Sequence, residues 1–413
     1  MSTEIIHDPR EYVRGLQQIL ISDSKRVGFL FGAGTSLAIK RGGSQESKVP
    51  AVKEMTERII NSITKPEFMN ALEIIKKEFD DGKINFNIEY ILSNITQKEQ
   101  VVGREKLCGL SKSDFQELRQ LIENEIIGIV SVHKKYHLFM DNLIHCDFTQ
   151  WIIQASRKYP IEIFTTNYDY LFELGLEYHN VPYFDGFVGS FEPFFNQTSV
   201  EDLAFAAEYT KLWKIHGSLG WYFNEDNKKV IRKHPDDSNI MVYPSLLKYD
   251  NSKKQPYVSF IDRLGKFVQK DDTVLFVCGY SFGDQHINAV IVNALKKAST
   301  SHVMGFYFDD LVEDSDIVRM AKNQPKMSIY SRNYAVIGGK YGRWKLRNEP
   351  DKEDSILIDL YFDENFATPS KEQGKDEYNW TGEGDFKLQG FNEFVEFLSF
   401  LNYGNSKFFG DKR

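Results

Sequence analysis

Short apolar runs that end in small or polar residues recur along the chain. Each run has strand length and is rich in β-branched and aromatic residues, which predicts a buried strand followed by a turn. The three clearest units are Arg26–Phe31 with Gly32-Ala-Gly-Thr-Ser36, Ile161–Phe164 with Thr165-Thr-Asn-Tyr-Asp169, and Thr273–Cys278 with Gly279-Tyr-Ser-Phe-Gly-Asp284. Further strands are predicted at Lys211–Ile215, His302–Phe308 and Met327–Tyr330.

A helix is predicted directly after the third unit. Apolar residues between Ile287 and Leu295 recur at the three- and four-residue spacing of an amphipathic helix, and Asp284 stands at the N-cap position. Strands that alternate with helices indicate an α/β protein with a Rossmann-like, parallel sheet. Ligands of such sheets bind beyond the carboxyl ends of the strands, where these polar turns are expected.

The interval between the first two units is too long for one crossover helix. It contains segments with helical patterns and few Gly or Pro, at Val52–Ile63, Phe68–Phe79, Asn87–Ile95 and Phe115–Val130. The sequence therefore predicts a domain over residues 1–331 with a helical insertion at about 52–150.

Residues 332–413 are predicted to form a C-terminal extension. Asn348–Gly390 is largely polar, and Phe391–Tyr403 is a helix with apolar residues on much of its circumference. Such a helix must be buried, either in the core or against another subunit. The extension is a candidate surface for assembly, and we expect a homo-oligomer.

Composition and charge narrow the class of protein. Of the 413 residues, 51 are basic and 59 are acidic, and the net charge of −8 is opposite to that of most proteins that grip nucleic acid. Only Cys108, Cys146 and Cys278 carry thiols, and their spacing fits neither a disulfide framework nor a four-thiolate zinc site. The charged N-terminus is unlike a secretory signal and no apolar run is long enough to span a bilayer, so a cytoplasmic protein without a membrane or metal site is expected.

The turn Gly32–Ser36 could bring backbone N–H groups close to a phosphate, although a short Gly-rich turn is often structural. Leu37 stands where a dinucleotide fingerprint has its third glycine, and the Gly-Lys of a Walker loop is missing. Asn167 follows a strand and could cap the next helix; if Asp169 caps instead, Asn167 could orient a ribose hydroxyl or a water.

His216 ends the Lys211–Ile215 strand and is a candidate general base, or a structural histidine. Gly279-Tyr-Ser-Phe-Gly283 also matches the nucleophile elbow of serine hydrolases, but that chemistry needs an acid and then a histidine later in the chain. Only His302 follows His286, which disfavours a hydrolase of that type.

The order of Gly32-Ala-Gly-Thr-Ser36, Thr166-Asn-Tyr-Asp169, Ile215-His-Gly-Ser218 and Gly279-Tyr-Ser281 resembles the Sir2 (sirtuin) family, in particular the Sir2-like NADases of bacterial antiphage defence. The resemblance covers about residues 27–331 and implies NAD+ as the substrate. It implies that Asn167, Asp169 and His216 act in catalysis. The residues implied to bind NAD+ are Gly32, Ala33, Gly34, Thr35, Ser36, Gly279 and Ser281.

Departures from deacetylating sirtuins change the expected reaction. The four-cysteine zinc ribbon is absent, and Lys48-Val-Pro-Ala-Val-Lys53 stands where those enzymes have Gly-Ile-Pro-Asp-Phe-Arg. The resemblance therefore implies an NAD+ glycohydrolase that releases nicotinamide and ADP-ribose. The alternatives are an NAD-dependent protein deacylase and a non-catalytic NAD or ADP-ribose sensor. The extension, about 80 residues long, is short for a sensor domain. This arrangement resembles the standalone Sir2 subunits that assemble with a HerA-like hexameric ATPase, which is the partner that the resemblance implies.

Overall fold

A mostly parallel sheet lies at the centre of the protein. The computed structural model describes residues 4–82, 86–155, 157–224, 226–234, 240–241, 255–351, 355, 357–364 and 380–403. Within these residues ten strands form the sheet, in the spatial order β1 (Ile6–His7), β15 (Lys340–Trp344), β14 (Tyr334–Ile337), β13 (Met327–Tyr330), β12 (His302–Phe306), β11 (Thr273–Cys278), β2 (Arg26–Phe31), β3 (Glu162–Thr165), β7 (Thr210–Lys214) and β4 (Tyr183–Phe184). Strands β13 to β4 pair in parallel, whereas β14 pairs antiparallel with both β13 and β15.

This arrangement confirms the predicted Rossmann-like α/β class. β2, β11 and β13 have the predicted bounds, and β3 and β7 are each displaced by one residue from their predicted positions. β12 ends at Phe306, two residues earlier than predicted. The strands are buried almost throughout because helices cover both faces of the sheet, which is why they read as continuous apolar runs.

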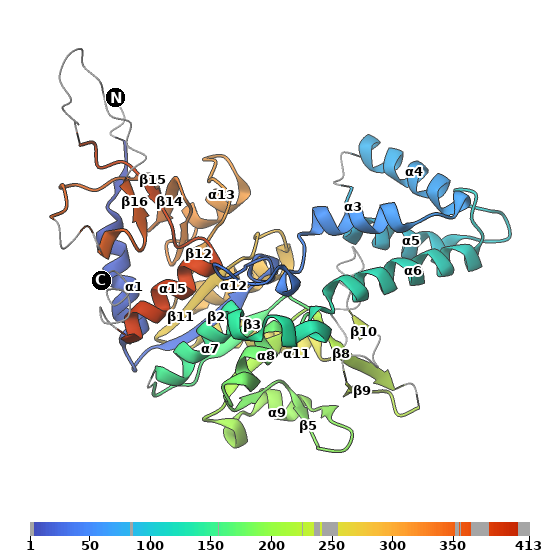
Figure 1. The fold of residues 1–413 in the computed structure, drawn as a ribbon, viewed down its shortest axis with the longest axis horizontal. Helices are drawn as coiled ribbons and strands as arrows, with labels where there is room; N and C mark the ends of the chain where they lie inside the picture. Colours follow the sequence, from blue (N-terminus) through green and yellow to red (C-terminus); the bar gives the residue numbers. More distant parts are fainter. Residues whose placement is uncertain are drawn as a thin grey trace, which may run out of the picture.

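Two helical layers cover the sheet (Figure 1). One hydrophobic core joins the sheet to α1 (Pro9–Ile21), α7 (Ile144–Gln154), α8 (Leu171–Tyr178) and α15 (Phe391–Tyr403). A second core, on the opposite face, joins it to α11 (Tyr257–Gln269), α12 (Gln285–Lys297) and α13 (Asp316–Lys322). Side chains of successive residues in a strand point to opposite faces of the sheet, so Leu212 lies in the first core and its neighbour Trp213 lies in the second.

The helical insertion has its own core and projects from one end of the sheet (Figure 1). It consists of α3 (Val52–Ser62), α4 (Pro66–Asp81), α5 (Ile88–Val101) and α6 (Lys112–Val130). Leu219, Tyr168 and Tyr170 pack against this core and connect it to the sheet edge. Near the end of the predicted insertion, α7 packs on the sheet with α8 and α15 and thus belongs to the main layer.

The helix α15 is buried within the chain. Phe391, Phe394 and Phe397 lie in the sheet core, and the Phe394 ring centroid is 4.8 Å from that of Phe306. Of the two positions predicted for this apolar helix, the core is the one it occupies. The predicted boundary at residue 331 falls between the paired strands β13 and β14, so the extension continues the central sheet. Part of its polar stretch, residues 352–354, 356 and 365–379, lies outside the described residues.

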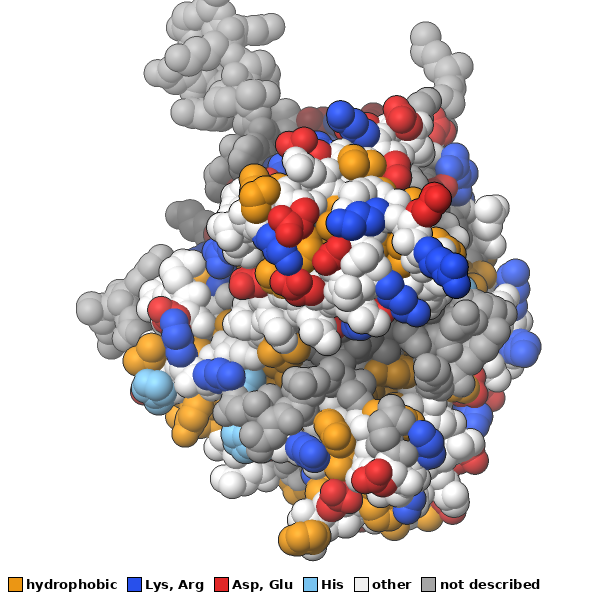
Figure 2. Space-filling model, turned by 90° about the vertical axis from the view of Figure 1, so that its right-hand side faces the viewer, with side chains coloured by type: hydrophobic (Ala, Val, Ile, Leu, Met, Phe, Trp, Pro, Cys, Tyr) orange, Lys and Arg blue, Asp and Glu red, His pale blue; other side chains and the backbone are white. Residues whose placement is uncertain are grey.

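Small β elements and short helices complete the described fold. A five-stranded sheet contains β10 (Ile240–Met241), β8 (Gly217–Asn224), β9 (Lys229–Arg232), β6 (Phe194–Phe195) and β5 (Phe187–Val188). β16 (Phe362–Asp363) pairs with β17 (Asp385–Phe386), and α2 (Ala33–Ser36) and α9 (Gln197–Glu201) are one-turn helices. Among the described helices, none combines the length and apolar character needed to cross a membrane. Figure 2 shows acidic and basic side chains interspersed on the end of the molecule that carries the insertion.

Candidate functional site

The four turns singled out by the sequence meet at the carboxyl edge of the parallel sheet. β2 lies between β11 and β3, and β7 follows β3, so their C-terminal turns are neighbours. The register pairs Phe31 with both Cys278 and Thr165, and Thr165 with Lys214. Each turn therefore begins at the same level of this edge, as expected for parallel strands of one sheet.

The Gly-rich turn packs directly on the turn after β11. A Cβ at Gly32 would lie 2.5 Å from Gly279 O, and a Cβ at Gly34 would lie 2.7 Å from Gly279 Cα. Gly279 has φ +67°, a conformation that glycine adopts without strain, and Gly34 N donates to Gly279 O at 2.9 Å. These glycines are thus required for backbone-to-backbone contact between the two loops, in addition to any contact with a ligand.

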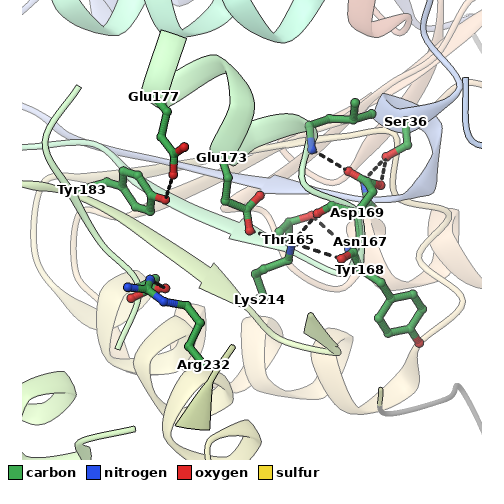
Figure 3. A network of polar contacts seen from close by, with 12 residues as sticks. Ser36, Thr165, Asn167, Tyr168, Asp169, Glu173, Glu177, Tyr183, Lys214 and Arg232 are labelled. Atoms are coloured by element: carbon green, nitrogen blue, oxygen red, sulfur yellow. Dashed lines mark hydrogen bonds and ion pairs between the residues drawn. The ribbon is translucent and has the colours of Figure 1, made fainter. Parts of the chain in front are cut away.

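Asn167 fixes the Gly-rich turn from the neighbouring strand. Its Nδ2 lies 3.1 Å from Gly32 O, 3.0 Å from Thr35 Oγ1 and 2.8 Å from Ser36 Oγ (Figure 3). The side chain is buried with 6% exposure. Asn167 therefore does not cap α8, and its amide group holds together the loop that the resemblance assigns to NAD+.

Asp169 connects the same turn to the start of α8. Its Oδ1 accepts from Leu171 N at 3.1 Å, as an N-terminal helix partner does, and its Oδ2 accepts from Ser36 Oγ at 2.6 Å. The N-cap position of α8 is Tyr170, whose side chain makes no capping hydrogen bond, so neither Asn167 nor Asp169 is the N-cap. Asp169 instead bonds the first helical N–H from the residue before the N-cap. Asp169 is 4% exposed, so both of its oxygens act inside the protein.

Lys214 of β7 also contacts this turn, and it is not among the residues predicted for the site. Its Nζ donates to Tyr168 O at 3.3 Å, to Asp169 O, and to Glu173 Oε1 at 2.8 Å. Lys214 and Glu173 are both buried. Burial raises the pKa of Glu173, and the Lys214 ammonium opposes that rise. A lysine within an apolar strand was the signal available, because a buried ammonium needs an anion and carbonyl oxygens around it.

His216 pairs with Asp284, the residue that precedes α12 on the second core's face of the sheet. Its Nε2 lies 3.2 Å from Asp284 Oδ2, and the two side chains are 14% and 10% exposed. The other oxygen, Asp284 Oδ1, accepts from His286 N at 2.9 Å and from Ile287 N at 3.3 Å, which confirms the predicted N-cap of α12. The sequence identified the capping role of Asp284 but not its contact with His216, which spans 68 positions along the chain.

Some of the remaining predicted residues are accessible at this edge, and others are buried. Ala33 and Ser281 are exposed, and Gly34 and Gly279 are partly exposed, whereas Thr35 and Ser36 turn inward. The residues present fit an extended nucleotide, because two small-residue turns expose backbone beside an imidazole–carboxylate pair. Among the described residues, no cluster of three or more His, Cys, Asp or Glu side chains is arranged to hold a metal ion.

A separate cavity of about 310 Å³ opens on the α8 side of the sheet edge. It is lined by Tyr170, Glu173, Glu177, Tyr183, Asp185, Lys214, Ser218, Trp221, Arg232 and Lys233. None of the ten residues predicted for catalysis or NAD+ binding lines it. The cavity and the predicted site are therefore distinct, and Lys214 lies between them (Figure 3).

Comparison with protein families agrees with this geometry. Residues 161–326 match the family model of the SIR2-like domain, an interval that contains Asn167, Asp169, His216 and the Gly279 turn. No curated protein matches the chain. A SIR2-like domain implies a function that involves NAD, in line with the exposed backbone of the two small-residue turns. Over residues 161–326, the chain is therefore similar to the SIR2-like domain.

Proposed function

We propose that this protein is a cytoplasmic NAD+ glycohydrolase that cleaves NAD+ to nicotinamide and ADP-ribose. The observation that carries the proposal is the His216–Asp284 contact at 3.2 Å. His216 is an imidazole paired with a carboxylate, and it follows β7, the neighbour of the strand that precedes Asn167 in the sheet. That is the arrangement expected of a general base that acts on water or on a ribose hydroxyl.

The reaction breaks the bond between C1′ of the ribose and the nicotinamide nitrogen. Nicotinamide leaves with the bonding electron pair, and the ribose passes through an oxocarbenium-like state, as in other glycosyl transfers. His216 accepts the proton from the attacking water or from a ribose hydroxyl, and Asp284 stabilises the imidazolium that results. Asn167 and Asp169 keep the Gly-rich turn in place through Ser36.

Sequence features support water as the acceptor rather than an acyl-lysine. The segment 48–53 lacks the Phe-Arg that deacetylating sirtuins place over the nicotinamide end, and Leu219-Gly-Trp-Tyr222 does not resemble a peptide-binding strand. In the structure Leu219–Tyr222 belongs to β8, whose Trp221 pairs with Arg232 of β9 and whose Tyr222 pairs with Ile231. The backbone of these residues thus already pairs with another strand of the same chain.

The test measures NAD+ loss and nicotinamide release by the purified protein, alone and with candidate activators. His216→Ala should abolish nicotinamide release, whereas His286→Ala, an exposed histidine at the start of α12, should not. Equal activity of wild type and His216→Ala in the active assembly would refute the mechanism. Acceleration by an acyl-lysine peptide with formation of acyl-ADP-ribose would indicate a deacylase, and binding without turnover would indicate a sensor.

The proposal extends to a role in antiphage defence, in which NAD+ depletion acts together with a HerA-like hexameric ATPase. Its support is the resemblance of the motif order to such Sir2-like NADases. Co-expression with a HerA-like hexameric ATPase, followed by size-exclusion chromatography, tests the assembly. Separate elution of the two proteins, with no change in NAD+ hydrolysis on mixing, would rule this partner out.

A further inference from the structure

The cavity beside α8 contains a buried acceptor that the protein itself leaves unused. Glu173 Oε1 accepts from Lys214, but Glu173 Oε2 is buried and accepts no hydrogen bond from any described residue. Glu173 is only 7% exposed and lines the cavity. A buried carboxylate oxygen without a donor costs about 1–3 kcal/mol. The missing donor is a group that a ligand can supply.

Two cations, Arg232 and Lys233, line the opposite side of the cavity together with the carboxylates of Asp185 and Glu177. Arg232 pairs with Asp185 and Lys233 lies 3.6 Å from the centroid of the Tyr222 ring, and both cations line the cavity. Figure 3 shows Tyr183 and Arg232 on one side and Glu173 with Lys214 on the other. The Arg232 side chain is 37% exposed, so one ion pair with Asp185 does not enclose its guanidinium group. It can donate to an anionic ligand group from that side.

Aromatic rings occupy the walls between these two ends. Tyr170, Tyr183 and Trp221 line the cavity, and the Tyr170 ring lies 4.8 Å from Lys214 Nζ. Flat, partly polar walls are suited to a planar ring, as in many small-molecule sites. The volume of about 310 Å³ is at the small end of the range for ligand pockets, which is about 300–1,000 Å³.

We infer that this cavity binds a mononucleotide whose base carries an exocyclic amino group. The amino group donates to Glu173 Oε2, the base lies among the aromatic walls, and the phosphate binds Arg232 and Lys233. A keto group in place of the amino group presents an oxygen to the carboxylate, which repels it. The site is separate from the proposed NAD+ site and does not depend on that activity.

Ligand binding here is linked to the turn that carries Asn167 and Asp169. Glu173 shares its carboxylate between the ligand and Lys214, and Lys214 donates to Tyr168 O and Asp169 O. A ligand that withdraws charge from the shared carboxylate changes how firmly Lys214 holds that turn. The cavity is therefore placed to regulate the neighbouring site.

Isothermal titration calorimetry with CMP and UMP tests the inference, because these differ by an amino group against a keto group. CMP should bind the full-length protein at least tenfold more tightly than UMP, and AMP at least tenfold more tightly than IMP. Glu173→Gln should reverse the CMP preference, because Lys214 holds the amide oxygen and directs the NH2 group into the cavity. Equal affinities in each pair, or binding of neither CMP nor AMP at millimolar concentration, would overturn the inference.

Two further variants assign the binding to this cavity. Arg232→Gln should weaken the affinity for CMP at least fivefold, whereas the affinity for cytidine, which lacks the phosphate, should not change. Lys229 is an exposed cation on the same strand, and Lys229→Gln serves as the matched control. This arm remains decisive even if Glu173→Gln fails to fold. His216→Ala should not alter CMP binding. Loss of CMP binding in His216→Ala with retention in Arg232→Gln would locate the nucleotide at the other site and refute the assignment.

Discussion

Asp284 has two roles on its two oxygens, and two substitutions separate them. Oδ1 caps α12 through the N–H groups of His286 and Ile287, and Oδ2 contacts His216 Nε2 at 3.2 Å. Asn is as good an N-cap as Asp, so Asp284→Asn should leave the free energy of unfolding within about 0.5 kcal/mol of wild type. Asp284→Ala loses the cap as well and should cost about 1 kcal/mol.

The charge of Asp284 determines the expected effect on rate. Two unit charges 3.2 Å apart attract by about 5 kcal/mol at an effective dielectric constant of ~20, which is an upper bound. The net value of a hydrogen bond to a charged group is lower, about 1.5–3 kcal/mol. Since about 1.4 kcal/mol corresponds to a factor of ten, Asp284→Asn should lower kcat for nicotinamide release roughly tenfold to 150-fold.

The assay follows nicotinamide release and urea unfolding for the wild type and both variants. The acidic limb of the pH–activity profile should also move to lower pH in Asp284→Asn, because the imidazolium of His216 loses its counter-ion. A structural role alone would not move that limb. Full activity in Asp284→Asn, or an activity loss that appears only in Asp284→Ala, would show that the cap and not the charge matters, and would refute the reasoning.

Three stability predictions follow from buried contacts elsewhere in the fold, each measured by urea unfolding. Arg263→Met should lower the free energy of unfolding by about 3–5 kcal/mol, because the Glu162 carboxylate, which is 6% exposed, loses the arginine that it pairs with. Adding Glu162→Gln should recover much of that stability. No recovery in the double variant would contradict an electrostatic cause. Gly279→Ala should lower the free energy of unfolding by about 1–3 kcal/mol more than Gly42→Ala does. Both glycines have a positive φ. A Cβ at Gly279 would lie 2.6 Å from Thr35 N, whereas a Cβ at Gly42 would meet no described atom within 4 Å. Phe394→Ala should cost about 3–5 kcal/mol, because the ring is fully buried in the sheet core; an unchanged midpoint would show that α15 does not belong to that core.

The strands and the turns after them were predictable because they depend on local composition. A run such as Thr273–Cys278 is buried on both faces of the sheet, so its apolar character is continuous and its bounds are sharp. The N-cap Asp284 was predictable for the same local reason, since the capping oxygen bonds N–H groups two and three residues ahead. The SIR2-like assignment depended on the order of such turns along the chain.

Long-range partners were not predictable from these patterns. The position of α15 was left open between the core and another subunit, because an apolar circumference requires burial but does not identify what covers it. The end of the insertion was also misplaced, since α7 and the inserted helices have similar amphipathic patterns but pack on different cores. Nothing local to Lys214 indicates that its ammonium holds the Tyr168 and Asp169 carbonyl oxygens.

Local sequence patterns predict the α/β class, the polar turns after the strands and the candidates Asn167, Asp169 and His216. The contacts of those residues depend on the folded chain: Asn167 holds the Gly-rich turn, Asp169 joins that turn to α8, and His216 pairs with Asp284. The physical reason is the range of the interactions. Strand burial and helix capping act over a few residues, whereas the site is formed by side chains from separate strands that meet only when the sheet is assembled.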